Sequence, residues 1–135
     1  MMNEQEMRQA MGVLEAYKAQ LEAINEQGQL LQMSLEDYFR AKDTLLAVSK
    51  GKPGDEVLMP VGGSSYVHAS IVHSDRVLVG VGTSVSMDKP VEEAIATVEA
   101  RIGEMMDALK KVSESRTVLE SKMQQLSQGL QQGLK

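Results

Sequence analysis

The 135-residue sequence has no cysteine and no tryptophan, and it contains one phenylalanine and three tyrosines. The lack of cysteine excludes disulfide bonds and thiolate metal sites, and it fits a reducing compartment. Because aromatic residues make up only 3% of the chain, large rings do not fill a deep core. Leu, Val, Ile, Ala and ten Met supply the apolar side chains, which suits the narrow seams between helices. A small helical bundle with an aliphatic core is the alternative.

Charge and hydropathy argue against nucleic acid and membrane as partners. The net charge is −5, both signs are spread along the chain, and no block of basic residues occurs, so nucleic acid is not an expected partner. No stretch approaches the ~20 apolar residues of a membrane span. The first ten residues are polar and acidic, which predicts no secretory signal. We therefore expect a cytoplasmic protein without membrane contact.

Two stretches carry the heptad pattern of a coiled coil, in which apolar residues recur at alternating spacings of three and four. The first seam consists of Met7, Ala10, Leu14, Tyr17, Leu21, Ile24, Gly28, Leu31, Leu35, Tyr38, Lys42 and Leu45. The second consists of Val91, Ile95, Val98, Ile102, Met105, Leu109, Val112, Arg116, Leu119, Met123, Leu126 and Leu130. The pattern predicts long helices over residues 1–50 and 89–133.

The segment between the two seams has the composition of β-strands. A run of Gly, Lys, Pro and Asp at 51–55 ends the first helix, and four short β-rich runs follow, separated by turn signals. This pattern predicts two β-hairpins within residues 55–87. Asp88 is the expected N-cap of the second helix, with Pro90 in its first turn.

Matched helix lengths and a short connector favour an antiparallel pair of helices, and a parallel bundle with other chains is the lesser option. Lining up the ends next to the hairpins places Val48 near Lys89 and Met7 near Leu130. Both termini then lie at the tip far from the hairpins. The predicted fold is therefore α+β: a long antiparallel two-helix coiled coil with two central hairpins, forming a single domain over residues 1–135.

Polar residues and glycines interrupt the seams. Lys42 and Arg116 occupy core positions, where a single polar residue can fix the register. The alignment predicts that Lys42 lies near Glu92 or Glu93, and that Arg116 lies near Glu22. Gly28 and Gly103 lie within the helices and permit close packing or bending, and the pattern does not decide between the two.

Groups for catalysis are scarce. His68 falls in a predicted strand and His73 in a turn, with no cysteine or clustered carboxylates beside them, so neither a metal site nor a cofactor is expected. The serines Ser64, Ser65 and Ser84 lack a base and an orienting partner. The glycine-rich turns do not match the phosphate-binding patterns that open a helix. We therefore expect a protein that is not an enzyme.

The end of the coiled coil far from the hairpins combines glycines with flexible apolar residues. Gly12, Gly129 and Gly133 each cost roughly 1 kcal/mol relative to Ala in a helix, so we expect fraying. The apolar residues of this region are Met1, Met2, Met7, Met11, Met123, Leu126, Leu130 and Leu134. Methionine suits surfaces that accept many partners. One hypothesis is a loose tip that grips exposed hydrophobic segments, and the other is ordinary seam residues beside a disordered end.

Specific motifs appear in the β segment. The run from Glu56 to Val67, with its PVGGSSY stretch, resembles the first hairpin of prefoldin α-type subunits, and the run from Asp75 to Thr83, with VLVGVGT, resembles the second. The following KPVEEA stretch, 89–94, is similar to the start of that family's second helix. The helix–two hairpins–helix order covers the whole chain. A β-type subunit carries one hairpin here, so the resemblance is to the α-type.

The resemblance implies a hexamer of two α and four β prefoldin subunits, of the archaeal type. Its hairpins form a β-barrel platform, and its coiled-coil tips hold non-native polypeptides and deliver them to a group II chaperonin without nucleotide. By position, the platform residues are Val57, Met59, Val61, Val67, Ile71, Val77, Val79 and Val81. The client-binding residues are Met7, Met11, Leu14, Met123, Leu126 and Leu130.

Two hypotheses of other classes compete with a chaperone subunit. The first is a structural coiled-coil spacer or filament-forming subunit that binds no client, for which rigid, well-capped ends and no exposed apolar tip are expected. The second is a small phosphate-binding enzyme, which lacks every required constellation of residues.

Overall fold

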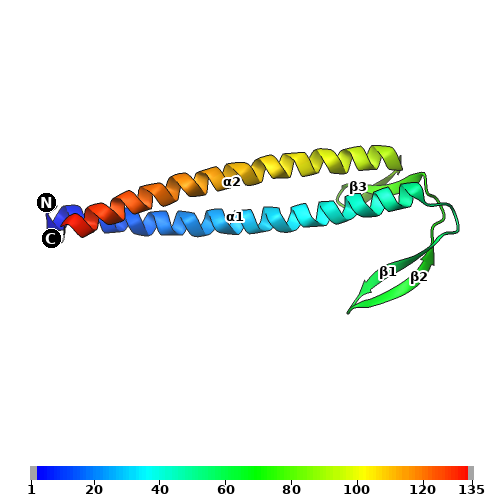
Figure 1. The fold of residues 1–135 in the computed structure, drawn as a ribbon, viewed down its shortest axis with the longest axis horizontal. Coiled ribbons are helices and arrows are strands. Elements are labelled where there is room, and N and C mark those ends of the chain that lie inside the picture. The colour runs from blue at the N-terminus through cyan, green and yellow to red at the C-terminus, as the bar shows by residue number, and fades with distance from the viewer. Residues whose placement is uncertain (1–2, 134–135) are drawn as a thin grey trace. The chain divides into compact units, whose positions relative to one another are not determined.

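The computed structural model describes residues 3–133, which form two helices and four strands (Figure 1). In chain order they are α1 (Glu4–Lys50), β1 (Glu56–Gly62), β2 (Ser65–Ser70), β3 (Arg76–Gly82), β4 (Val85–Pro90) and α2 (Val91–Gly133). The strands form two separate antiparallel hairpins, β1–β2 and β3–β4. The predicted α+β class and the order of helix, two hairpins and helix are confirmed.

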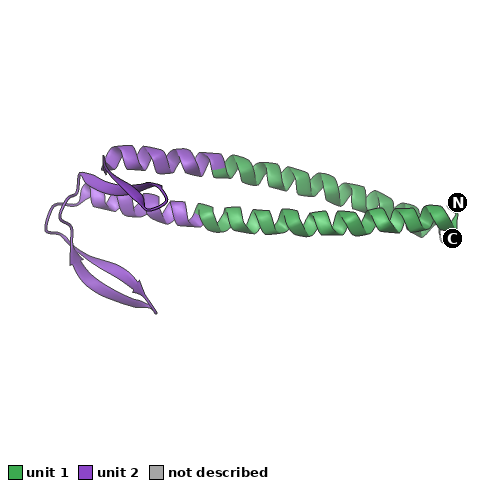
Figure 2. Cartoon of the chain, turned by 180° about the vertical axis from the view of Figure 1, so that it is seen from behind, with its two compact units in different colours: residues 1–35, 105–135 green, residues 36–104 purple. Residues whose placement is uncertain are grey.

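The chain divides into two compact units (Figure 2). Residues 1–35 and 105–135 make up one, which we call the helical unit, and it contains the terminal part of each helix. Residues 36–104 make up the other, the hairpin unit, which contains both hairpins and the adjoining helix segments. Each unit is described separately below.

The heptad seams account for the burial along the two helices. Every residue of the first predicted seam is buried or half buried, and the only exposed residue of the second is Arg116. Leu35 and Leu119 are the most buried seam residues of the helical unit, at 6% exposure each. Most charged and amide residues lie outside the seams and are exposed. The helices therefore bury one stripe each, as a coiled coil does.

Within the helical unit the two helix segments run antiparallel. Figures 1 and 2 show them side by side, with the start of α1 and the end of α2 at the same end of the unit. Gly28 of α1 lies opposite Val112 of α2, since a Cβ added to Gly28 would be 3.4 Å from Val112 Cγ1. The predicted antiparallel pairing is confirmed here.

The expected partners of the two polar seam residues are wrong. Lys42 Nζ lies 3.6 Å from Glu99 Oε1, whereas Glu93 pairs with Lys89 at 3.8 Å. The antiparallel alignment of Val48 with Lys89 already places Lys42 opposite Ile95 rather than Glu92 or Glu93, and α2 begins two residues later still, at Val91. The counterpart of Lys42 is therefore further along α2.

Arg116 forms no ion pair with Glu22 within residues 3–133. Its side chain is exposed although its heptad position lies in the seam. A long cationic side chain at such a position reaches water rather than remaining between the helices.

Different interactions define the two helix starts. At α1, Asn3 Oδ1 accepts a 2.8 Å hydrogen bond from the backbone N–H of Glu6, which is an N-cap arrangement. Asp88 was expected to cap the second helix, but it lies in β4, where its carboxylate accepts a 3.0 Å hydrogen bond from Arg76 Nε. The start of α2 is instead held by the Val91 N–H, which donates to the Asp75 carbonyl at 2.8 Å.

Turn chemistry explains where the hairpins reverse. In the first hairpin Gly62 pairs with Ser65, and the two loop residues Gly63 and Ser64 have φ of 58° and 59°. Two successive positive φ values define a type I′ turn, which matches the twist of the flanking strands. Ser84 has φ of 61° at the corresponding place in the second hairpin. The sequence signals for both turns are thus confirmed.

The two mid-helix glycines differ in their surroundings. At Gly28 an added methyl group would be in ordinary van der Waals contact with Val112, whereas a larger side chain would meet it directly. Nothing lies within 4 Å of the Cβ position of Gly103. Gly28 therefore permits close approach of the two helices, and Gly103 has no packing role within the described residues.

These surroundings predict opposite outcomes for substitutions. Gly103→Ala should stabilise the chain by about 1 kcal/mol, because alanine costs less backbone entropy in a helix. Gly28→Ala should gain slightly less, and Gly28→Leu should destabilise because it separates α1 from Val112. Thermal unfolding followed by circular dichroism checks the order of the three variants. A Gly28→Leu variant as stable as Gly28→Ala would contradict the close approach.

The Lys42–Glu99 pair predicts an effect on register more than on stability. The two side chains are 33% and 51% exposed, so the pair itself contributes at most about 1 kcal/mol. Replacing Lys42 with Leu should leave the register and the assembly less well defined, since an apolar residue accepts several alignments. We expect a broader melting transition and mixed oligomer sizes in gel filtration. Lys18→Leu, on an exposed position, is the control, and an unchanged oligomer and melting profile for Lys42→Leu would count against this role.

Candidate functional site

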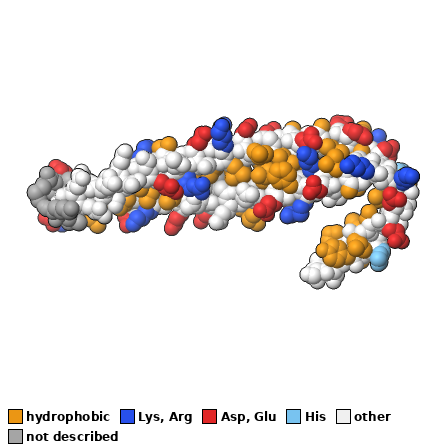
Figure 3. Space-filling view, viewed as in Figure 1, with side chains coloured by type: hydrophobic (Ala, Val, Ile, Leu, Met, Phe, Trp, Pro, Cys, Tyr) orange, Lys and Arg blue, Asp and Glu red, His pale blue; other side chains and the backbone are white. Residues whose placement is uncertain are grey.

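The two hairpins expose most of their apolar side chains. On β1–β2, Val57 pairs with Ala69 and Met59 pairs with Val67, which places all four side chains on one face. Figure 3 shows apolar side chains gathered on this hairpin. The exposed large apolar residues of the hairpin segment are Val57, Leu58, Met59, Val61, Tyr66, Val67, Val72, Leu78, Val81, Val85 and Met87. An exposed apolar surface of this kind is typical of a protein–protein contact.

Unpaired strand edges add to this surface. Each hairpin is a sheet of two strands that pair only with each other in the described chain, so two strand edges remain free in each. An isolated two-stranded hairpin is marginally stable in water, and free edges accept further strands. Covering one exposed Val, Leu or Met side chain contributes about 1.5–3 kcal/mol. The hairpins therefore present both the apolar area and the backbone groups for association.

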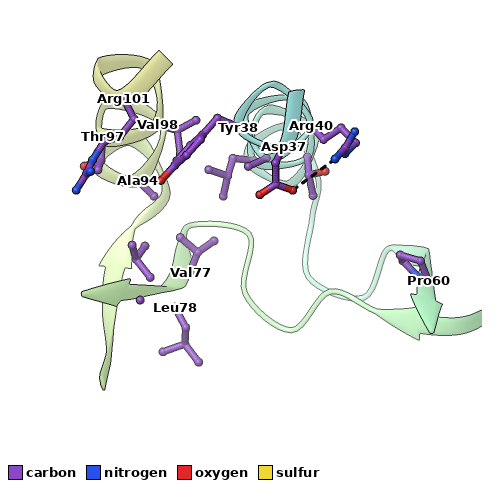
Figure 4. A pocket seen from close by; sticks show the side chains of 15 residues that line it. Asp37, Tyr38, Arg40, Pro60, Val77, Leu78, Ala94, Thr97, Val98 and Arg101 are labelled. Carbon is purple, nitrogen blue, oxygen red and sulfur yellow. Dashed lines mark ion pairs between the residues drawn. The ribbon is translucent and has the colours of Figure 1, made fainter. Parts of the chain in front are cut away.

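The residues predicted to serve a platform differ in exposure. Val57, Met59, Val61, Val67 and Val81 are exposed, whereas Ile71, Val77 and Val79 are half buried. Figure 4 shows the Val77 side chain directed toward the helices and Leu78 directed away from them. Val77 and Val79 thus lie on the inner face of the second hairpin. Their assembly role, like that of the whole set, stays a prediction.

Several exposed apolar residues of the hairpins are not among those predicted from the sequence. Leu58 lies opposite His68 and Pro60 opposite Tyr66, on the face that does not carry Val57. The sequence prediction included only one alternating set of residues, which lies on the face that carries Val57. The unbroken apolar run at 57–61 indicates that both faces of this strand are apolar. In the second hairpin Leu78 is the most exposed apolar residue, at 76%.

A cavity of about 650 Å³ lies beside β3 in the hairpin unit (Figure 4). Residues 77–80 of β3 line one side, and segments of α1 and α2 line the other, including Tyr38 and Val98. Asp37 and Arg40 form an ion pair of 3.6 Å at its rim. Most of the other lining side chains are apolar, so the cavity offers an apolar surface beside a charged rim.

The part of the chain that the structure describes, residues 3–133, has few histidines and two long helices rich in charged residues. Within that range no group of three or more His, Asp or Glu residues is placed to hold a metal ion. Neither α1 nor α2, over its described length, is apolar enough to cross a bilayer.

The predicted client-binding residues lie in the helical unit. Met7, Leu14, Met123, Leu126 and Leu130 are half buried between the helices, and Met11 is 57% exposed. α1 begins at Glu4 and α2 continues to Gly133, so Gly12 and Gly129 lie within the helices, and their fraying in solution stays a prediction. Buried or half-buried seam residues flank Gly12 and Gly129 on both sides, which offsets the low helix propensity of these two glycines. Met1, Met2 and Leu134 lie outside the described residues.

Comparison with known proteins assigns the family. The family described as "Prefoldin subunit" matches residues 17–135. The chain belongs to the prefoldin family. Prefoldin subunit alpha of Methanothrix thermoacetophila is 34% identical over 110 residues, covering 82% of this chain and 72% of the relative. Prefoldin subunit alpha of Methanocorpusculum labreanum is 32% identical over 130 residues, covering 96% and 88%. The predicted similarity to prefoldin α-type subunits is confirmed.

Solved prefoldin structures share the fold. The filamentous prefoldin of Methanocaldococcus jannaschii, determined by cryo-electron microscopy, superposes with a TM-score of 0.71 at 25% identity, covering 85% of this chain and 95% of that one. The prefoldin β subunit of Thermococcus strain KS-1 superposes with a TM-score of 0.66 at 19% identity, covering 96% and 92%. Both support the arrangement of long helices and small hairpins described above.

Because the hairpin faces are exposed, a substitution there should change association with other subunits without changing the fold of the chain. If the hairpins associate with other subunits, Met59→Asp should weaken that association at least tenfold, because it places a charge on an apolar face that we expect a partner to cover. The helical content should not change, since Met59 is 51% exposed within the chain. Gel filtration with light scattering measures the first effect and circular dichroism the second. Met33→Asp, at a 65% exposed position on α1 away from the hairpins, is the matched control, and equal behaviour of the two variants would contradict the prediction.

Proposed function

We propose that this chain is a subunit of an ATP-independent co-chaperone. Membership of the prefoldin family supports a chaperone-type function. In the proposal the hairpins associate with those of other subunits, and the helix ends hold non-native polypeptides. The observation that carries it is the exposed apolar surface of the hairpins, whose strand edges are unpaired within the described chain.

The partners we infer are prefoldin β subunits, in a hexamer of two α and four β chains. Strand pairing at the free edges of β1–β2 and β3–β4 would close the sheets into a β-barrel platform, which removes the edges altogether. The similarity of this chain to α subunits over most of its length supports the assignment. An α chain with two hairpins offers twice as many free strand edges for pairing as a chain with one hairpin.

The clients we infer are unfolded proteins, which the subunit passes to a group II chaperonin without nucleotide. Exposed Met11 and the half-buried apolar residues beside it offer a deformable surface for apolar segments. Delivery to that chaperonin implies a cytoplasmic location. Residues 1–135 would act as one functional domain, since assembly through the hairpins would bring the client-binding helix ends of several subunits together.

A filament-forming subunit is the second candidate. The structure of Methanocaldococcus jannaschii to which this chain is similar is that of a filamentous prefoldin. Free strand edges on both hairpins are compatible with an open chain of subunits as well as with a closed ring. Electron microscopy of this chain, alone and with a β subunit, distinguishes filaments from closed particles.

The client-binding part of the proposal predicts a loss on removing the helix ends. The complex with a β subunit is mixed with an unfolding client, and aggregation is followed by light scattering. A version that lacks residues 1–11 and 124–135 should protect the client poorly, because the apolar ends are missing. Met11→Ser, which removes one exposed apolar side chain, should protect less well than Met33→Ser, a control at a 65% exposed position further along α1.

Full protection by the shortened version would show that clients bind elsewhere. Failure to form any complex with a β subunit would remove the platform assignment instead. A version that assembles and no longer protects is the expected result.

A further inference from the structure

Three hollows adjoin one another on one side of the helical unit. They have volumes of about 550, 310 and 430 Å³. The first two share Ile24, Lys111 and Ser115 in their linings, and the first and third share Lys122. We refer to the three hollows together as the groove, and their lining residues on α2 run from Ala108 to Leu126, a length of roughly 27 Å at 1.5 Å per residue.

The floor of this groove is apolar. Seam residues of both helices form it, and Val118 stands 54% exposed at its edge. The seam residues in the lining are Tyr17, Ile24, Val112, Leu119 and Leu126. Small side chains at Ala108 and Ser115 keep the groove open above the seam. An apolar floor reached between two helices accepts the apolar face of a third helix.

The rim of the groove is basic. Lys111 and Lys122 are exposed, and neither forms an ion pair with any residue between 3 and 133. Glu114 is the one acidic residue among those lining the three hollows. The chain as a whole has a net charge of −5, so this local excess of positive charge is opposite in sign to the net charge of the chain. The two lysines are eleven residues apart, three turns of helix or roughly 16 Å.

We propose that this groove binds an amphipathic helical segment of a client that carries carboxylates on either side of an apolar stripe. The apolar side chains would occupy the floor, and two carboxylates about three turns apart would pair with Lys111 and Lys122. The identity of the occupant as a client rests on the proposed function. The pairing of an apolar floor with unpartnered lysines selects acidic amphipathic segments over basic ones.

The test measures binding of defined peptides to the assembled complex. One labelled peptide has an apolar helical stripe with a glutamate near each end, eleven positions apart, and a second has lysines in the same places. Fluorescence anisotropy should show the glutamate peptide binding roughly fivefold tighter at low salt, because two exposed ion pairs each contribute up to ~1 kcal/mol. Salt should reduce that difference, since the pairs are accessible to ions.

A matched pair of variants isolates the two lysines. Lys111→Glu with Lys122→Glu should reverse the preference between the peptides. Lys18→Glu with Lys110→Glu makes the same change in charge on exposed lysines of the same helices that line none of the three hollows, and it should leave the preference unchanged. Circular dichroism confirms that both variants keep their helices.

The outcomes separate this inference from the proposed function. If the wild-type complex suppresses client aggregation but binds the two peptides equally, or if both variants behave alike, the groove does not select acidic segments. If the lysine reversal changes the oligomeric state rather than peptide binding, the groove is a contact between subunits and the proposal is overturned. If the assembled complex neither protects clients nor binds either peptide, the proposed function fails with it.

Discussion

A two-helix coiled coil buries only one stripe of each helix, and the other features of this chain follow from that limit. The seams bury one stripe of apolar side chains, with Leu35 and Leu119 among the few that are nearly inaccessible, while other apolar residues of the helices, such as Met33, stay exposed. The hairpins add little buried surface, because β3 lies beside the helices but nearly all of β1–β2 is exposed, and Val91 is the only large side chain in the described residues that is fully buried. The chain lacks a core large enough to enclose its β segment, so that segment remains open to partners.

Periodic and local signals predicted the main elements. The heptads predicted which helix residues are buried, because a 3.5-residue repeat keeps the same face toward the partner helix. Turn residues predicted both hairpin reversals, since Gly63 and Ser64 adopt the left-handed conformation that such a turn requires. These features depend on residues that are close together in the chain, so they can be predicted directly from the sequence.

The register of the helices and the end of β4 depend on contacts between distant segments, and the sequence predicted them less well. Asp88 has the chemistry of an N-cap, but cross-strand pairing with Arg76 holds it in a strand. That shift moved the start of α2, and the partner of Lys42 lies further along α2 than predicted. The groove beside Lys111 was missed for a similar reason, since residues of both helices line it and neither heptad pattern alone outlines it.

The two open surfaces differ in the kind of partner that each can accept. Strand edges bind through regularly spaced N–H and C=O groups, so a hairpin of this chain pairs only with another strand in a defined register. The groove between the helices offers an apolar floor and two flexible lysines, which fix neither the sequence nor the exact register of what binds. Directional pairing suits permanent assembly, whereas a shallow groove with a charged rim suits reversible binding of many segments. In the proposed function the first kind of surface lies on the hairpins and the second on the helices, and neither has to be covered for the seam to form.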